Sequence, residues 1–128
     1  MSDASDFLET AICNIFRATN ITAPATVYVA LYTAAPSDSG GGTELSGNGY
    51  ARQAVTFGAP SGGAIANSSS PTFGPNTSSN WGSITHIGIF DASTSGNLLA
   101  WRVATSARTV NVGDSYNIAV GALTITVA

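Results

Sequence analysis

The sequence contains no lysine, and its only cationic side chains are four widely spaced arginines: Arg17, Arg52, Arg102 and Arg108. Proteins that bind nucleic acid need a dense basic footprint to neutralise phosphates. Since no such cluster exists, we expect no nucleic-acid partner. The acidic residues are scattered too, and the formal net charge is only −3, so no acidic tail is predicted.

Cysteine and histidine each occur once, as Cys13 and His86. A single cysteine excludes an intrachain disulfide, and a zinc site needs several clustered ligands. A catalytic triad would have to use His86, which lies between apolar neighbours, and no GxSxG nucleophile elbow is present. We predict a structural or interface histidine, no catalytic residue, and no metal or cofactor. A catalytic Cys13–His86 pair is the less favoured alternative.

Glutamates are also scarce. Glu9 falls in a predicted helix and Glu44 in a glycine-rich loop, whereas glycoside hydrolysis normally needs two carboxylates flanking one bond. Asp38, Glu44 and Asp91 could contact calcium from their loops, but no EF-hand spacing is present. The sequence therefore predicts a protein that is not an enzyme.

Long apolar runs are missing as well. No stretch reaches the ~20 residues that a membrane-spanning helix requires. Ser2 and Asp3 stand where a secretory signal would carry basic residues. We therefore expect no membrane partner and synthesis in a cytoplasm.

Glycine, serine, threonine and short apolar clusters make up much of the rest. The fourteen glycines favour many short strands joined by turns over long helices. A chain of 128 residues is expected to form one domain, residues 1–128. The predicted fold is all-β: an antiparallel β-sandwich or barrel-like body over residues 26–127, with one N-terminal α-helix over residues 5–19.

The helix is predicted from apolar residues at helical spacing: Leu8, Ile12, Ile15 and Phe16. Asp6 and Glu9 supply an acidic first turn. We expect this helix to close one end of the β-body, with Cys13 as a small hydrophobe near its apolar face. The alternative is a docking helix for a partner.

The β-body is predicted to be organised around a hairpin over residues 81–103. Residues 84–90 are apolar on both alternating faces, which indicates an interior strand. Alternation places Ile84, His86, Gly88 and Phe90 on one face and Thr85, Ile87 and Ile89 on the other. Residues 91–97 form the polar turn. Trp101 on the return strand is expected to be buried, with its indole N–H hydrogen-bonded.

Further strands are predicted over residues 26–33, 50–57, 64–68, 106–110 and 116–127. In the last of these the alternation changes parity at Gly121 and Ala122, which predicts a β-bulge or bend. The loop of residues 37–48 holds three consecutive glycines and is expected to be mobile unless a partner orders it.

Three segments resemble a family of small virion proteins of tailed bacteriophages. They read VALYTAAPSDSGGGTELSGNGYARQAVTFGAP, WGSITHIGIFDASTSGNLLAW and RTVNVGDSYNIAVGALTITV. Members are commonly labelled tail fibre proteins, and some related small phage β-proteins coat the capsid as cement (decoration) proteins. The resemblance covers most of residues 26–127. It implies a virion structural protein and supplies no catalytic residue.

The resemblance and the absence of a shaft or coiled coil favour a capsid cement protein. We expect a homotrimer on the capsid exterior, made in the bacterial host cytoplasm and bound to the major capsid protein. Contacts are expected from the loops 37–48 and 76–80 or from the helix. The alternative is a tail fibre or tail-adaptor module that binds another tail protein or a host glycan. Tyr50 and Trp81 would then stack on sugars, although core packing is the favoured interpretation for both. An enzyme such as a glycan hydrolase is the third hypothesis.

Overall fold

A computed structural model describes residues 3–127, which form one short helix and a set of antiparallel strands. The elements are α1 (Asp6–Ile15), β1 (Val27–Ala34), β2 (Thr43–Glu44), β3 (Gln53–Val55), β4 (Ala64–Ala66), β5 (Thr72–Phe73), β6 (Ser83–Phe90), β7 (Leu98–Thr109), β8 (Tyr116–Asn117) and β9 (Thr124–Thr126). The predicted all-β architecture with an N-terminal helix is confirmed.

The largest element is a five-stranded antiparallel sheet with the order β2-β1-β6-β7, in which β3 also pairs with β1. Strand β6 lies between β1 and β7, so the prediction of an interior strand is confirmed. Val29 pairs with Ile89 and Leu31 with Ile87 across β1 and β6. All four side chains are buried in the main core, which explains why both strands are rich in β-branched residues.

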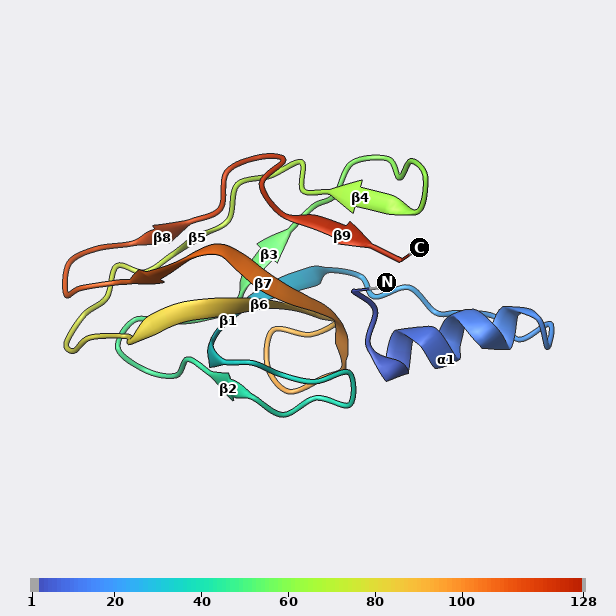
Figure 1. Cartoon of the computed structure of the whole chain (residues 1–128), viewed down its shortest axis with the longest axis horizontal. Coiled ribbons are helices and arrows are strands. Elements are labelled where there is room, and N and C mark those ends of the chain that lie inside the picture. Colours follow the sequence, from blue (N-terminus) through green and yellow to red (C-terminus); the bar gives the residue numbers. More distant parts are fainter. Residues whose placement is uncertain (1–2, 128) are drawn as a thin grey trace.

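Two small antiparallel sheets, β4-β9 and β5-β8, form a second layer over the large sheet (Figure 1). The main core lies between the layers and joins residues from both. From the large sheet it includes Val29, Leu31, Ile87 and Ile89, and from the second layer Phe73, Tyr116, Leu123 and Ile125. A smaller apolar cluster on the outer face of the large sheet contains Ala30, Tyr32, Phe90 and Leu98.

A β-bulge in the central hairpin overturns the faces predicted by simple alternation. Thr85 of β6 lies opposite residues 104–107 of β7, so the pairing shifts there. Ile84 is therefore fully buried in the main core beside Ile87, while Phe90 belongs to the outer cluster. The prediction that Ile84 and Phe90 share a face is wrong, because the regular alternation is interrupted around Thr85, where four residues of β7 lie opposite one residue of β6.

Three strand predictions also need correction. The strand predicted over residues 50–57 is limited to β3, and residues 106–110 do not form a separate strand because β7 continues to Thr109. The segment 116–127 is broken into β8 and β9, which pair with different partners. Gly121 has φ +80° and its N–H donates to the Asn67 carbonyl at 3.0 Å, so the chain turns there, which agrees with the bend of the two predicted alternatives.

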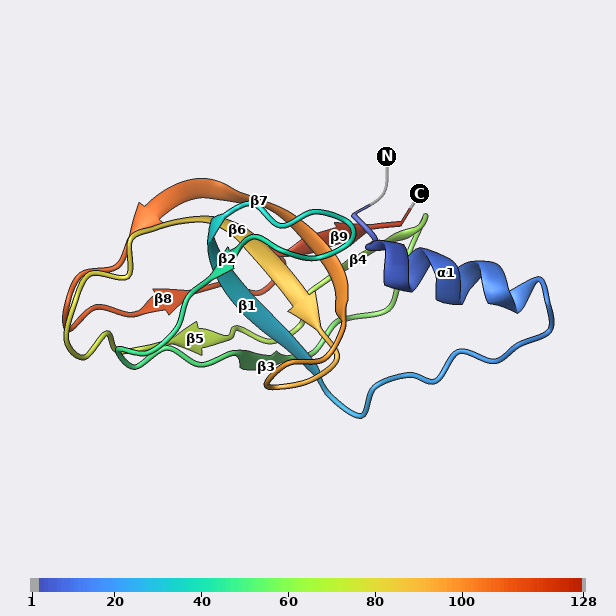
Figure 2. The same ribbon diagram turned by 90° about the horizontal axis from the view of Figure 1, so that it is seen from below.

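The helix α1 and the return segment 16–26 form what we call the N-terminal arm, residues 6–26. It projects from one end of the β-body (Figure 2). The helix ends at Ile15, short of the predicted residue 19, because Ala18 adopts a left-handed φ of +58°. The Thr19 N–H then closes the turn on the Asn14 carbonyl at 3.0 Å. No residue of α1 is buried, so the prediction that it closes the β-body is wrong.

The base of the arm is fixed to the β-body. Ser5 is the N-cap: its hydroxyl accepts from the Leu8 N–H at 3.3 Å and donates to the Leu98 carbonyl. Just before it, the Asp3 N–H donates to the Thr126 carbonyl at 2.6 Å, and the Thr126 N–H donates to Asp3 Oδ2 at 2.8 Å. The helix therefore starts from a buried, fully bonded anchor.

Candidate interaction surfaces

Cys13 and His86, the two side chains best suited to nucleophilic chemistry, lie in different parts of the molecule. Cys13 is exposed on α1, so its prediction as a small hydrophobe near a core face is wrong. His86 lies in mid-strand on β6. Its Nδ1 is 2.8 Å from the Thr85 hydroxyl, and its ring centroid is 5.9 Å from that of Trp101. These are packing contacts, and they join no nucleophile to a base.

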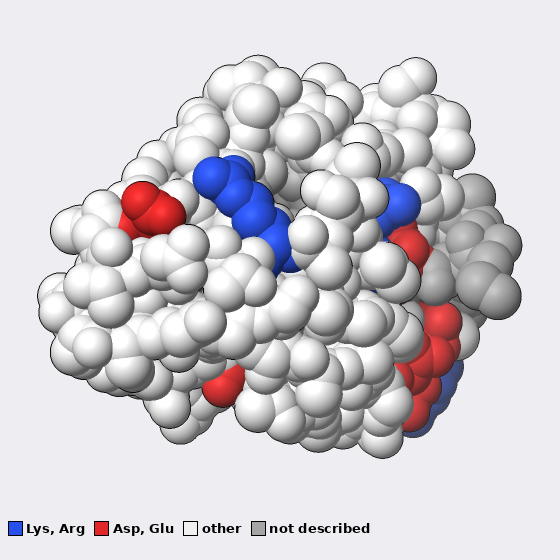
Figure 3. Space-filling model, turned by 60° about the vertical axis from the view of Figure 1, so that its left-hand side comes forward, with Lys and Arg blue, Asp and Glu red and all other residues white. Residues whose placement is uncertain are grey.

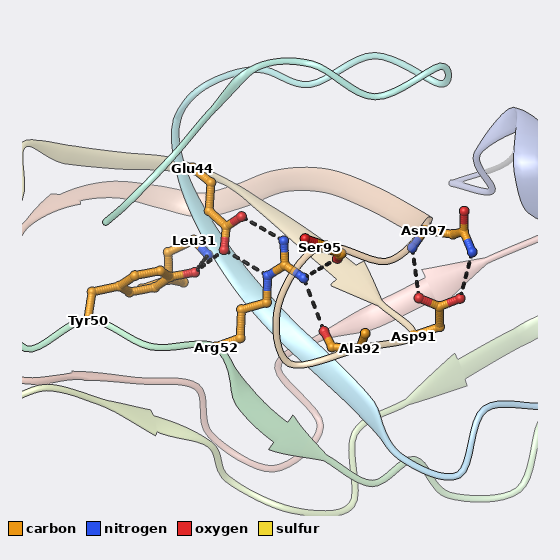
Figure 4. Close-up of polar contacts among 8 residues, drawn as sticks. All are labelled: Leu31, Glu44, Tyr50, Arg52, Asp91, Ala92, Ser95 and Asn97. Atoms are coloured by element: carbon orange, nitrogen blue, oxygen red, sulfur yellow. Dashed lines mark hydrogen bonds and ion pairs between the residues drawn. The ribbon is translucent and has the colours of Figure 1, made fainter. Parts of the chain in front are cut away.

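The loop carboxylates make separate structural bonds. Asp38 Oδ1 accepts the indole N–H of Trp101 at 3.0 Å, which confirms the expected partner for that indole. Trp101 itself is only half-buried. Asp91 accepts the N–H and the side-chain amide of Asn97 at 2.7 and 2.9 Å (Figure 4), and the backbone hydrogen bond lowers the pKa of Asp91. Within residues 3–127, no three His, Cys, Asp or Glu side chains gather as a possible metal site.

A partly buried ion pair holds the loop 37–48 against the body (Figure 4). Arg52 donates from Nη2 to Glu44 Oε1 and from Nε to Glu44 Oε2, both at 2.8 Å. The Tyr50 hydroxyl donates to Glu44 Oε2 at 2.8 Å and accepts the Leu31 N–H at 3.1 Å. Burial raises the pKa of Tyr50, and the hydrogen bond to Glu44 raises the pKa of Arg52. The loop is therefore fixed by the chain itself, contrary to prediction.

Arg52 also reaches the turn of the central hairpin. Its Nη1 donates to the Ala92 and Ser95 carbonyls at 3.0 and 2.7 Å, and its guanidinium carbon lies 3.6 Å from the centre of the Phe90 ring. The side chain is 8% exposed. This ion pair was not predicted, because Glu44 and Arg52 are eight positions apart in a segment without periodicity.

Tyr50 and Trp81 belong to the core, as the favoured interpretation of these aromatics predicted. Their rings meet edge to face at 5.9 Å, and Tyr50 stacks on Phe73 at 6.1 Å. Trp81 is 5% exposed, and its indole N–H donates to the Asn48 carbonyl at 3.0 Å. The predicted sugar-stacking platform of Tyr50 and Trp81 is therefore not available at the surface.

The outer face of the large sheet carries a groove of about 510 Å³. Its floor includes Tyr32 and Phe90, and its walls include Asp38, Asn97 and the start of the arm at Phe7. Tyr32 is 3% exposed, and burial raises its pKa to about 12. An aromatic floor with a polar rim is the usual composition of a small-ligand site.

The N-terminal arm concentrates exposed apolar side chains. Its large exposed hydrophobics are Phe7 at 47%, Ile15 at 55%, Phe16 at 89% and Ile21 at 40%. A second groove, of about 420 Å³, runs between α1 and the return segment 20–24, with Leu8, Ala11 and Leu99 in its lining. Several large exposed apolar side chains on one segment mark an interaction site more often than single scattered ones do.

Charge is sparse over the rest of the surface, and most of the face drawn in Figure 3 is uncharged, with charged side chains at only a few places. Besides the Arg52–Glu44 pair, Arg102 lies 3.7 Å from Asp3. No helix among the described residues is long and apolar enough to span a membrane.

Comparison with known proteins gives one informative result. Curated proteins yield no match to the sequence. A family model described as podophage GP4 fiber I protein gp80 matches residues 3–126, nearly all of the chain. This agrees with the resemblance of the strand segments to phage virion proteins. The protein therefore belongs to the podophage GP4 fiber I protein gp80 family of phage virion proteins.

Proposed function

We propose that the protein is a structural module of a phage tail fibre, with no catalytic step of its own. The family match over residues 3–126 carries this proposal, because the family is described by its fibre members. The bonding of the polar side chains supports it. Glu44, Arg52, Asp91 and Asp38 are engaged in structural hydrogen bonds, which leaves them unsuited to turnover.

In this role the two-layered β-body is a rigid unit and the N-terminal arm is its attachment surface. The partners would be another tail protein or further copies of this chain. Interfaces between subunits have an apolar core, and the exposed side chains of the arm, such as Phe16, could supply it.

The location can be tested on particles by immunogold labelling against the β-body. We expect label at the tail and none over the head. Phage carrying an arm variant, Phe16→Asp, should lose the label, while phage carrying the body-surface variant Val120→Asp should keep it. Label over the head, with none at the tail, would contradict the tail-fibre proposal.

Capsid cement, the role that the sequence analysis favours, is the second candidate, and one observation supports it: residues 3–127 form a β-body and an arm without a shaft element. A cement protein that binds only the assembled shell would stabilise it by mass action. Purified virions with and without the protein would then release DNA at different temperatures. Equal release temperatures would exclude this role. Binding to the major capsid protein and a homotrimeric state belong to this second candidate.

A host glycan is a further partner for the tail-fibre role, and the groove over Tyr32 supports it better than Tyr50 and Trp81 do. Its rim carries the exposed polar side chains Asp38 and Asn97, which could bond sugar hydroxyls. A binding assay with host surface polysaccharide should show affinity that Asn97→Leu abolishes and Val120→Asp retains. Equal binding by both variants would exclude this groove.

A further inference from the structure

The two layers of the β-body leave a groove between the edge of β7 and the second layer. Strand β7 is the last strand of the large sheet. Beside it lie two hollows of about 380 and 250 Å³, one toward β9 and one toward β8. Ile87, Thr105 and Ala122 line both hollows. The two hollows are therefore parts of one groove, which we call the β7 groove.

One wall of the β7 groove is a strand edge that the chain covers only in part. Residues 3–5 lie along the start of this edge: the Ser5 N–H donates to the Leu99 carbonyl at 2.8 Å, and the Trp101 N–H donates to the Asp3 carbonyl at 3.1 Å. Among the described residues, no backbone pairing of this kind continues along the edge beyond Trp101. A strand edge with open N–H and C=O groups is a template for another extended chain.

The charged side chains of the groove are both positive. Arg102 donates to the Thr124 carbonyl of β9 at one end, and at the other end the guanidinium carbon of Arg108 lies 5.8 Å from the centre of the Tyr116 ring of β8. No Asp or Glu stands among the described lining residues. Arg102 lies 3.7 Å from Asp3, whereas Arg108 forms no ion pair with a described carboxylate. In a chain with four arginines and a net charge of −3, two cations along one groove favour an anionic occupant.

We propose that the β7 groove binds a short, extended, acidic segment of another protein. The segment adds to the edge of β7 beyond Trp101 through backbone hydrogen bonds, and its carboxylates lie beside Arg102 and Arg108. This contact is separate from the N-terminal arm. It goes beyond the fibre role and does not rest on it, since the same groove would be present in the tail or on the capsid.

A second copy of this chain fits the groove less well than an acidic partner does. Pairing of two β7 edges would bring the arginines of both chains together, and like charges on paired strands are destabilising. The pairing of β6 with β7 is also irregular at Thr85, which lies opposite residues 104–107. Because a bulge bends and twists a strand, a long flat strand does not follow the whole edge, and only a short segment is expected to add.

An acidic polysaccharide would match the arginines but not the rest of the groove. Tyr116 is the one aromatic residue among the described lining residues, and it is only 7% exposed, so it offers no open ring face to a sugar. The exposed walls include Thr105, Ala119 and Ala122, which are small side chains beside peptide groups. This composition favours an extended polypeptide.

Binding can be measured by fluorescence anisotropy with the full chain and a labelled synthetic peptide. The probe is a heptapeptide of alternating valine and threonine with a glutamate at each end, because Arg102 and Arg108 are six positions apart. We expect a Kd below about 1 mM. The same peptide with glutamines at its ends should bind about tenfold more weakly or worse, and so should one with a central proline, which has no N–H for a strand ladder.

Each probe has an outcome that contradicts the proposal. A Kd above about 1 mM for the glutamate peptide would overturn it. Equal binding of the glutamine peptide would show that the arginines do not select the occupant, and equal binding of the proline peptide would exclude strand addition. Tighter binding of an oligogalacturonate than of the glutamate peptide would assign the groove to an acidic polysaccharide instead.

Charge reversal at the surface tests the role of the arginines. Arg108→Glu should weaken binding of the glutamate peptide about tenfold or more, because it places a carboxylate beside the carboxylate of the peptide. Arg17→Glu changes the net charge by the same amount on the arm and should leave binding unchanged. Both arginines are exposed, so both variants are expected to fold, which circular dichroism checks. Equal effects of the two variants would overturn the proposal.

The place of binding can be mapped by NMR during titration with the glutamate peptide. The amide signals of Val103 and Thr105 should shift, and these amides should gain protection from exchange as the edge of β7 becomes paired. The signal of Phe16 on the arm should not move. Shifts confined to the arm, or to the groove over Tyr32, would overturn the assignment to the β7 groove.

Discussion

The β-body and the N-terminal arm use apolar residues in opposite ways. In the body, Leu31, Phe73 and Ile84 are fully buried between two layers of strands. In the arm, α1 buries no residue at all, and Phe16 is almost wholly exposed. Apolar content is therefore not by itself a sign of a core. The body covers its apolar side chains within the same chain, whereas among the described residues the arm leaves Phe7, Ile15 and Phe16 largely exposed.

The two regions also differ in how they are held. The body is crossed by long-range contacts such as the hydrogen bonds from Arg52 to the Ala92 and Ser95 carbonyls, which join one loop to another. The arm is anchored at its base, where Ser5 bonds to Leu98. We expect substitutions in the body to change folding and substitutions at the arm tip to change association. Four predictions test that division, from the largest expected effect to the smallest.

Truncation of the same residue type in the two regions should give the largest difference. Phe73→Ala creates a cavity in the main core and should lower the free energy of unfolding by about 3–5 kcal/mol. Phe16→Ala removes a side chain that is 89% exposed and should change it by less than about 0.5 kcal/mol. Urea denaturation at a protein concentration that keeps the chain monomeric measures both. If the two variants lose similar amounts of free energy of unfolding, the expected difference between the β-body and the arm is wrong.

Removing one partner of the Glu44–Arg52 pair should lower the free energy of unfolding by somewhat less than Phe73→Ala does. Arg52→Ala leaves Glu44 without its ion-pair partner and frees the Ala92 and Ser95 carbonyls, so we expect a loss of about 3 kcal/mol. Glu44→Gln in the same chain should recover part of that loss, because no unpaired carboxylate then remains. A double-mutant cycle measures the coupling, and strictly additive losses would show that the pair is not coupled.

Loss of the anchor of the arm should lower the free energy of unfolding by less than loss of the Glu44–Arg52 pair does. Ser5→Ala removes the N-cap and the bond to Leu98, and should cost about 1–2 kcal/mol. Thr10→Ala, on the exposed face of the same helix, is the matched control and should cost less than about 0.5 kcal/mol. Amide exchange over residues 6–15 should rise only in Ser5→Ala. Unchanged exchange there would mean that other contacts hold the base.

The smallest effect concerns pH. Hydrogen bonds from Asn97 lower the pKa of Asp91 in the folded state, so its contribution to stability is present above its unfolded pKa of about 3.9. That contribution is lost as pH falls through the lower, folded value. Melting temperatures of the wild type and Asp91→Asn should therefore differ above about pH 4 and converge as the pH falls below it. Parallel curves would show that the carboxylate does not stabilise this turn.

The division between the two regions also marks where sequence reasoning succeeds. Strand type and the central position of β6 were predictable, because apolar residues on both faces of residues 84–90 require a neighbour on each side. The burial of Ile84 on the other face could not be predicted in this way. Nothing in the sequence around Thr85 indicates that extra residues of β7 lie opposite it. The alternation of apolar residues is read within a single strand, whereas a bulge depends on how two strands pair, so alternation alone does not predict it.

The arm shows a second limit. Helical spacing of Leu8, Ile12 and Ile15 correctly predicted a helix, yet the same pattern suggested packing against the body. The periodicity of an amphipathic helix predicts an apolar side, but it does not indicate whether the same chain or another molecule covers that side. The Glu44–Arg52 pair was hidden for a related reason: its partners meet through tertiary structure, and neither residue stands in a motif.

The bonded ends of the chain have a practical consequence. Asp3 and Thr126 exchange backbone and side-chain hydrogen bonds, so a short glycine linker could join them without disturbing either layer. New termini could then be opened at the exposed turn of residues 61–63. Such a circular permutant would keep the β-body and place its new ends beside the joined ones, since the Val127 N–H donates to the Gly63 carbonyl. A cargo could then be fused at this end of the molecule.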